Sequence, residues 1–262
     1  MKTKFVSLDD LKFQTHPAAK LFRALELQTI YQQTKNMKFK QPSMDLGGGD
    51  GYLTSLLFDD TFTYNVDNGE AKDVHVSIQK KRYKKVLIES AEKTSIKSNS
   101  LNFIFSNSVI EHIPDNEAVL REVARTLKKG GVFIFTSPSD KFKEYLWIPD
   151  ILKKIGLEFL IEPYKNKRNQ MLNHYHTYSH KTWTKKLKKH GLVVKKYAYY
   201  IEKENGKLWD KIAWQTKFRA LFDKQADNHV YNKHKELIAA RYKSDTVKGD
   251  CGASLFIYAV KK

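Results

Sequence analysis

The stretch Met44-Asp45-Leu46-Gly47-Gly48-Gly49-Asp50-Gly51-Tyr52 decides the expected fold of this chain. A short run that ends at Leu46 is typical of a strand, and residues 52–58 are apolar at 53, 56 and 57, which favours a helix. The glycines between them predict a turn in which the backbone takes a positive φ or lies close to a ligand. In an open α/β sheet, such a turn lies at the carboxyl end of its strand, where ligands bind.

The spacing of the turn narrows the choice of ligand. The dinucleotide fingerprint G-x-G-x-x-G needs a third glycine where this chain has a tyrosine. The pattern here is acid-x-G-x-G-x-G, formed by Asp45, Gly47, Gly49 and Gly51. The acidic residues would repel a pyrophosphate but not a ligand with an ammonium and a sulfonium group. The stretch resembles the first motif of the class I S-adenosylmethionine-dependent methyltransferases, although glycine turns are also common in purely structural loops.

Two following segments extend this resemblance towards the nucleoside end of the cofactor. The β-forming run 61–67 ends in Asp67, which the resemblance places on the ribose hydroxyls; the alternative is the N-cap of a following helix. A third strand, residues 85–89, is followed by Ser90, Ala91 and Glu92. The resemblance implies that Ala91 and Glu92 lie beside the adenine, with Ser90 where the family often has aspartate.

A second strong signal is the run Ser106-Asn107-Ser108-Val109-Ile110-Glu111-His112-Ile113, which follows the buried strand 103–105. It resembles the fourth motif of small-molecule methyltransferases, which implies that Asn107 contacts the cofactor. His112 is the best candidate for a catalytic base, because imidazole titrates near neutral pH. The alternative is a histidine at a helix start that is hydrogen-bonded to backbone.

Further along the chain, His174, Tyr175 and His176 resemble the loop that lines the substrate pocket in small-molecule methyltransferases. Two histidines at i and i+2 on an extended segment point the same way. A metal would need more ligands, and no cluster of acids or cysteines stands near them, so we expect no metal site.

Helical and strand patterns alternate along most of the chain, which predicts an α/β fold: one doubly wound, seven-stranded and mostly parallel sheet whose last strand is antiparallel. We expect one domain over residues 1–262, with helical insertions. In the leading helix, from Pro17 to about Tyr31, we expect Arg23 and Glu26 to form an exposed pair. The expected parts are a helical cover (1–40), a cofactor-binding core (41–138), a lid or substrate insertion (139–173) and C-terminal strands (174–262) with a helical insertion at 202–249. An ordinary packing insertion is the alternative for 139–173.

Composition limits the classes of partner. The chain has 262 residues, a formal net charge of +18 and 47 basic residues, of which only seven are arginine. The lysines are spread along the whole chain, which favours a solvated surface over a nucleic-acid site but leaves nucleic acid open as a partner.

The basic amphipathic stretch 202–249 would suit either internal packing or peripheral contact with an anionic membrane. One cysteine, no apolar run of about 20 residues and no secretory signal predict a cytoplasmic protein.

The sequence therefore predicts transfer of a methyl group from S-adenosylmethionine to a small-molecule acceptor by in-line displacement. Metabolites, sugars, quinones and lipid-linked compounds all remain open as acceptors. Two other classes stay open as well: an RNA or protein methyltransferase that uses the basic surface, and a non-catalytic cofactor-binding protein with the same fold.

Overall fold

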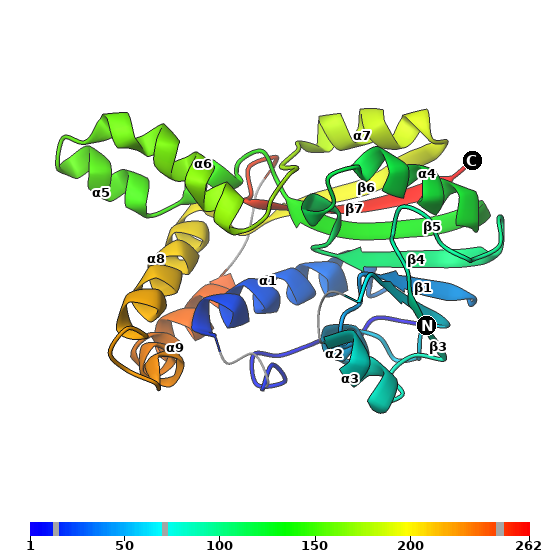
Figure 1. The fold of residues 1–262 in the computed structure, drawn as a ribbon, viewed down its shortest axis with the longest axis horizontal. Helices are drawn as coiled ribbons and strands as arrows, with labels where there is room; N and C mark the ends of the chain where they lie inside the picture. Colours follow the sequence, from blue (N-terminus) through cyan, green and yellow to red (C-terminus); the bar gives the residue numbers. More distant parts are fainter. Residues whose placement is uncertain (13–15, 70–72, 245–248) are drawn as a thin grey trace.

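Seven strands form one sheet in the order β3-β2-β1-β4-β5-β7-β6 (Figure 1). The structure is a computed structural model that describes residues 1–12, 16–69, 73–244 and 249–262. The predicted doubly wound sheet is confirmed. Its strands are β1 (Ser43–Leu46), β2 (Tyr64–Asp67), β3 (Lys85–Ile88), β4 (Leu101–Asn107), β5 (Leu127–Pro138), β6 (Leu192–Tyr200) and β7 (Ser254–Lys261).

The direction of the strands places the ligand crevice. Strands β1 to β5 pair in parallel, whereas β7 lies between β5 and β6 and runs antiparallel to both, as predicted for the last strand. From β1 the chain first builds outward through β2 and β3, and then returns to add β4 and β5 on the other side of β1. Ligands of open α/β sheets bind at this reversal, outside the carboxyl ends of the strands.

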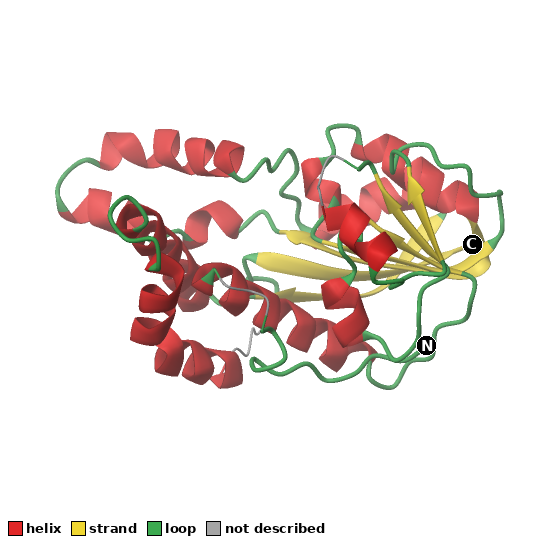
Figure 2. Cartoon of the chain, turned by 60° about the horizontal axis from the view of Figure 1, so that its bottom comes forward, coloured by secondary structure: helices red, strands yellow, loops and turns green. Residues whose placement is uncertain are grey.

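Helices cover both faces of the sheet (Figures 1 and 2). Since side chains alternate along a strand, Phe103 and Phe105 of β4 lie in the core that includes α1, while Ile104 lies in the core that includes α4 and α7. The helices are α1 (Pro17–Thr34), α2 (Tyr52–Leu57), α3 (Asp73–Gln79), α4 (Asn116–Thr126), α5 (Ile148–Lys154), α6 (Ile161–Met171), α7 (His180–Lys189), α8 (Lys203–Arg219) and α9 (Ala226–Ser244), with short 3-10 turns η1 (Ile110–His112), η2 (Phe142–Tyr145) and η3 (Glu158–Leu160).

Helices α8 and α9 lie against α1, so most of the apolar side of the basic stretch is buried within the chain. Leu208 and Ile212 of α8 belong to the same core as α1. At the end of α8, in contrast, Phe218, Leu221 and Phe222 are exposed. Residues 245–248 of the predicted insertion lie outside the described residues. None of the helices in the described ranges is long and apolar enough to cross a membrane.

The segment 139–173 folds into two helices that lie beyond the carboxyl end of β5 and beside α8 (Figure 1). Asp210 of α8 is fully buried and holds this segment in place. Its carboxylate accepts hydrogen bonds from Trp147 N (3.0 Å), Tyr164 Oη (3.0 Å) and Arg168 Nε (2.9 Å). Charge-assisted bonds of this kind are roughly twice as strong as neutral ones, so α5 and α6 are anchored to α8.

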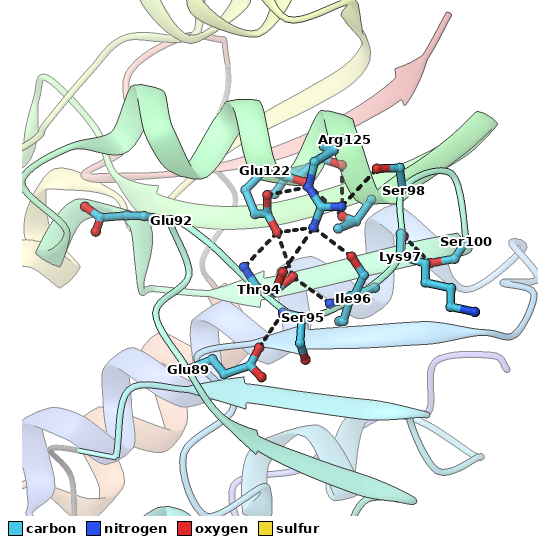
Figure 3. A network of polar contacts seen from close by, with 12 residues as sticks. Glu89, Glu92, Thr94, Ser95, Ile96, Lys97, Ser98, Ser100, Glu122 and Arg125 are labelled. Atoms are coloured by element: carbon cyan, nitrogen blue, oxygen red, sulfur yellow. Dashed lines mark hydrogen bonds and ion pairs between the residues drawn. The ribbon is translucent and has the colours of Figure 1, made fainter.

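The loop after β3 is held by an ion pair on α4, as Figure 3 shows. Glu122 accepts hydrogen bonds from the N–H and hydroxyl of Thr94 at 2.8 and 2.6 Å. Arg125, which pairs with Glu122, donates to Ile96 O at 2.7 Å and to Ser98 Oγ at 3.0 Å. These bonds fix the loop that carries Ala91 and Glu92 at the edge of the crevice.

The boundary between α4 and β5 differs from the expectation. The lysines and glycines at 128–131 predict a helix C-terminus, followed by a strand from Val132. In the structure, α4 ends at Thr126 and β5 already begins at Leu127, which pairs with Leu101. The register shifts between Leu101 and Phe103, and Gly130 has a φ of 76°. Gly130 therefore lies in an irregular part of β5 rather than at the end of a helix, and its positive φ is one that glycine adopts without strain.

Candidate functional site

Two adjoining cavities open at the carboxyl ends of the central strands. The first, of about 420 Å³, is lined by Arg23 of α1, Asp45, the glycine turn and the start of α2. The second, of about 830 Å³, is lined by the ends of β2 and β3, residues 108–114 and residues 172–175. Both are lined by Gly47, Ser108 and Val109. One elongated ligand could therefore occupy both cavities.

The glycine turn adopts the backbone that its sequence predicts. Gly47, Gly49 and Gly51 have φ values of 75°, 52° and 72°. A Cβ on Gly47 would lie 2.5 Å from Val109, and one on Gly51 would lie 2.6 Å from the ring of Tyr83, whereas one on Gly49 would meet nothing within 4 Å. Two glycines are thus required by packing as well as by φ, while Gly49 faces open space.

Asp45 places a buried carboxylate under this turn. It is 1% exposed, and its Oδ2 accepts hydrogen bonds from Thr54 Oγ1 and Tyr83 Oη, both at 2.6 Å. Burial raises the pKa of Asp45 to about 6, although the two hydrogen bonds work in the opposite direction. The carboxylate therefore gains from any positive charge that enters the first cavity.

Asp67 lies at the end of β2 and lines the second cavity together with Ser90, Ala91 and Glu92. Its Oδ2 accepts a hydrogen bond from Gly49 N, and its Oδ1 accepts one from Gly69 N, both at 3.2 Å. The described part of the next helix begins only at Asp73. Asp67 therefore braces the glycine turn through Gly49 N. Its bond to Gly69 N, two positions further on, is also a contact that an N-cap residue makes, and residues 70–72, which follow, lie outside the described residues.

The expectation of an exposed Arg23–Glu26 pair is wrong for Glu26, which is fully buried. Arg23 Nη1 lies 2.5 Å from Glu26 Oε2, and Arg23 itself lines the first cavity. Glu26 Oε2 also accepts from Asn107 Nδ2 (3.0 Å), and Oε1 accepts from Ser108 Oγ (2.6 Å). Helix α1 is thus tied to the end of β4 by charge-assisted bonds, which explains why the pair is not on the surface.

Asn107 lines the first cavity, where the resemblance places it. Its side chain is already engaged, because Nδ2 donates to Glu26 and Oδ1 accepts from Thr136 Oγ1 at 2.8 Å. It therefore shapes the wall of the cavity and fixes the position of α1.

His112 brings together residues that are remote in the sequence. It ends η1 and lines the second cavity, and its Nδ1 lies 3.1 Å from the carbonyl oxygen of Asn173. Its ring is 5.3 Å from that of His174, and its Nε2 lies 3.8 Å from Oε1 of Glu111. Burial is the main cause of a lowered pKa for His112. The helix-start alternative is correct in that the imidazole contacts a backbone carbonyl, but the carbonyl belongs to a distant segment.

Glu111 and His174 are the buried members of this cluster. Burial raises the pKa of Glu111 to about 8 and lowers the pKa of His174 to about 3. From the sequence we expected no cluster of acids or cysteines near His174, and the structure places one acid there, Glu111. Glu111 was missed, although it directly precedes His112 in the motif.

Tyr175 and His176 differ in their positions. Tyr175 is 60% exposed and lines the second cavity. His176 Nε2 lies 3.0 Å from Ile113 O and 2.9 Å from Pro114 O, and Nδ1 lies 2.9 Å from Tyr178 Oη. His176 therefore holds its loop against the segment after η1, and neither it nor His174 is among the described residues that line the second cavity.

Comparisons with known proteins agree with this geometry. Residues 44–135, from β1 into β5, match a methyltransferase domain family. A segment of 55 residues, 18% of this chain, is 38% identical to 13% of phosphoethanolamine N-methyltransferase 2 of Caenorhabditis elegans. Another of 64 residues, 24% of this chain, is 42% identical to 23% of sarcosine/dimethylglycine N-methyltransferase of Halorhodospira halochloris. The matched segments thus span less than a quarter of either relative.

A solved structure resembles the chain over nearly its whole length. The SAM-dependent methyltransferase of Thermotoga maritima aligns with 94% of this chain and 91% of its own, with a TM-score of 0.56 and 18% identity. At this level of identity the likeness establishes the fold, which is the seven-stranded Rossmann-like fold.

Proposed function

The chain belongs to the class I S-adenosylmethionine-dependent methyltransferases through its domain at residues 44–135, and on this premise we propose that it methylates a small-molecule acceptor. The observation that carries the proposal is the pair of cavities that share Gly47, Ser108 and Val109. The first suits the methionine end of the cofactor, and the second offers room for the adenosine and an acceptor.

The first cavity has charges of both signs, as the ammonium and carboxylate of a methionine require. The Asp45 carboxylate would attract the ammonium group, and the Arg23 guanidinium the carboxylate. Gly49, which has no atom within 4 Å of its would-be Cβ, would let the ligand approach the backbone. These residues fit the cofactor, which when bound supplies a methyl group on a sulfonium sulfur.

The nucleoside end would lie in the second cavity. Asp67 lines this space, and each of its oxygens, which already accepts one bond from Gly49 or Gly69, would accept a second bond from a ribose hydroxyl. Ala91 has a small side chain that leaves room for a flat ring, and Glu92 and Asn68 supply polar groups around it.

The remainder of the second cavity would receive the acceptor. His112, Asn173 and Tyr175 line this part. The whole second cavity, which would hold the nucleoside as well, has a volume of about 830 Å³, within the range of about 300–1,000 Å³ typical of small-molecule sites. These walls would align the acceptor with the methyl group, and alignment alone can lower the barrier by about 7–11 kcal/mol. His112 is the candidate to receive a proton from the acceptor, because Nδ1 faces a carbonyl and leaves Nε2 free to accept.

The choice of acceptors to test first follows from the names of the two matched relatives. Both are N-methyltransferases, of phosphoethanolamine and of sarcosine or dimethylglycine. Small amines are therefore the first panel, to be offered with methyl-labelled cofactor. Label in added RNA or protein, and none in small molecules, would favour the macromolecular alternative.

Peripheral membrane contact remains a second proposal about partners. It now concerns only the exposed end of α8, where Phe218, Leu221 and Phe222 are 59%, 70% and 93% exposed beside Lys217 and Arg219. Flotation with anionic vesicles, before and after Phe222→Ser, would test this contact.

Calorimetric titration with S-adenosylmethionine, S-adenosylhomocysteine and NAD tests the cofactor. We expect binding of the first two and none of NAD. Asp67→Asn should weaken binding about 10- to 100-fold, because hydrogen bonds to a charged group contribute about 1.5–3 kcal/mol. Glu236→Gln, which changes an exposed carboxylate on α9, is the matched control.

Asp67 also braces the glycine turn, so the unfolding midpoint of each variant must be measured alongside. Equal affinity in Asp67→Asn and wild type would show that this carboxylate does not hold the ribose. Failure of the wild-type chain to bind either sulfur compound would refute the proposed cofactor site.

A further inference from the structure

We infer that Glu111, His112 and His174 form a binding site for one divalent transition-metal ion at the wall of the second cavity. One carboxylate oxygen and one nitrogen from each imidazole lie within 4.8 Å of one another. The residues come from η1 and from the segment after α6, which are about 60 positions apart in the sequence. Only the tertiary fold brings them together.

Two atoms of this cluster are buried without a hydrogen-bond partner. Glu111 is 1% exposed, and its Oε2 has no partner; the Nδ1 of His174 is likewise buried and unpaired. A buried polar atom without a partner costs about 1–3 kcal/mol, and native proteins contain few of them. A cation between the carboxylate and the imidazole would satisfy both atoms at once.

The third member, His112, is oriented as metal-binding histidines are. Its Nδ1 lies 3.1 Å from Asn173 O. Since a carbonyl oxygen can only accept, the proton of the neutral ring must be on Nδ1, and the Nε2 lone pair remains free. Metal-ligating histidines almost always donate their other N–H to such a partner. The free Nε2 is the nitrogen that lies 3.8 Å from Glu111 Oε1.

The donor set indicates the class of metal. Two imidazoles and one carboxylate suit zinc, iron, cobalt, nickel or manganese, whereas calcium prefers six to eight oxygen ligands. Zinc–nitrogen bonds of about 2.0–2.1 Å would place the ligand atoms about 3.3 Å apart, so the widest separation in the cluster must contract by up to about 1.5 Å. His112, whose side chain is 41% exposed, has the freedom to make this adjustment.

Two guanidinium groups near the cluster would repel a cation, but each is already neutralised. Arg23 is paired with Glu26 at 2.5 Å, and Arg168 with Asp210 at 2.9 Å. The carboxyl group of Glu111 forms no ion pair with either guanidinium and lies beside the two imidazoles.

Such an ion would leave coordination positions open towards the cavity that His112 lines. On the proposed function, which this consequence presupposes, an oxygen or nitrogen atom of the acceptor would complete the coordination and be held beside the cofactor. His112 would then be a metal ligand and not a proton acceptor.

Titration of the full chain with Co²⁺, followed by visible absorption and by calorimetry, tests the metal site. We expect one Co²⁺ per chain and the ligand-field bands of a low-coordinate imidazole site. Glu111→Gln and His112→Gln should each weaken binding at least 100-fold, since even outer-shell changes cost about 10- to 100-fold. The control, His75→Gln, removes an exposed histidine on α3 and should bind as wild type does.

Titration of the same variants with S-adenosylhomocysteine separates this inference from the proposed function. Retained cofactor binding with lost Co²⁺ binding supports the metal site and shows that the variants are folded. The metal site is refuted if the wild-type chain binds no Co²⁺ stoichiometrically, or if Glu111→Gln and His112→Gln bind it as tightly as His75→Gln does. If the wild-type chain binds Co²⁺ but not S-adenosylhomocysteine, the proposed function is refuted and the metal site is not.

Discussion

Removal of the Glu26 carboxylate should be among the most destabilising single changes in this chain. Glu26 is fully buried between α1 and the carboxyl ends of three strands. It accepts hydrogen bonds from Arg23, from Asn107 at the end of β4 and the adjoining Ser108, and from Tyr200 of β6 at 3.1 Å. A fifth group, the hydroxyl of a threonine in β5, lies 3.0 Å from Oε1.

The magnitude follows from what each substitution leaves behind. Glu26→Ala leaves the Arg23 charge without its partner and leaves several hydrogen-bond donors without an acceptor. Breaking a buried ion pair in this way costs about 3–5 kcal/mol. Glu26→Gln keeps the size and one acceptor oxygen but turns an NH₂ group towards donors, so we expect an intermediate cost of about 1–3 kcal/mol. For a chain of this length, each kcal/mol lowers the melting temperature by about 2–4 °C.

Urea unfolding at pH 7, followed by circular dichroism and tryptophan fluorescence, measures these costs. Glu236→Ala, at an exposed position of α9, should stay within about 0.5 kcal/mol of wild type. The slope of the free energy of unfolding with urea must be the same in all variants for the differences to be compared.

The order of stability is the critical result. If Glu26→Ala is as stable as the Glu236→Ala control, the buried carboxylate does not hold α1 to the sheet. If Glu26→Gln is the less stable of the two Glu26 variants, loss of the acceptor is not the cause, and the reasoning from hydrogen bonds fails.

Three other predictions concern the site. Between pH 4 and 6 the folded chain keeps a proton on Asp45 that the unfolded chain has lost, so the contribution of Asp45 to the free energy of unfolding should fall by roughly 3 kcal/mol as pH rises through this window. Asp45→Asn should remove this fall. Urea unfolding of the wild-type chain that is unchanged across the window would contradict the prediction. Gly49→Ala should lower the free energy of unfolding by about 1–2 kcal/mol, because an alanine is strained at this positive φ. Gly51→Ala should lower it by at least about 1 kcal/mol more, because its Cβ also meets a tyrosine ring at 2.6 Å. Equal losses in the two variants, measured by urea unfolding, would contradict this. Arg125→Met should speed tryptic cleavage within residues 93–98 several-fold, and an unchanged cleavage rate would show that the Glu122 ion pair does not hold this loop.

The glycine turn and the sheet were predictable because their causes are local. Positive φ values at Gly47, Gly49 and Gly51 follow from residue type, and alternating apolar patterns follow from the period of a strand or helix. The antiparallel last strand was also predicted, but not its place between β5 and β6, since neighbours in a sheet are chosen by packing.

The expected cofactor residues are near one another for a related reason. In a parallel sheet all carboxyl ends lie at one edge, so Asp45, Asp67 and Asn107, each at the end of a strand, had to meet there. Their hydrogen-bond partners were not predictable, and Asn107 is engaged by Glu26 rather than left free for a ligand.

By itself the sequence determined the strand-turn-helix unit, the order of strands and helices, and the edge of the sheet where a ligand binds, because backbone preference and hydrophobic period act over a few residues. The tertiary structure alone decided that Glu26 is buried and that Glu111 and His112 meet His174. Whether a charged side chain is buried depends on partners far along the chain, here up to 174 positions away for Tyr200. Such contacts leave no local pattern in the sequence.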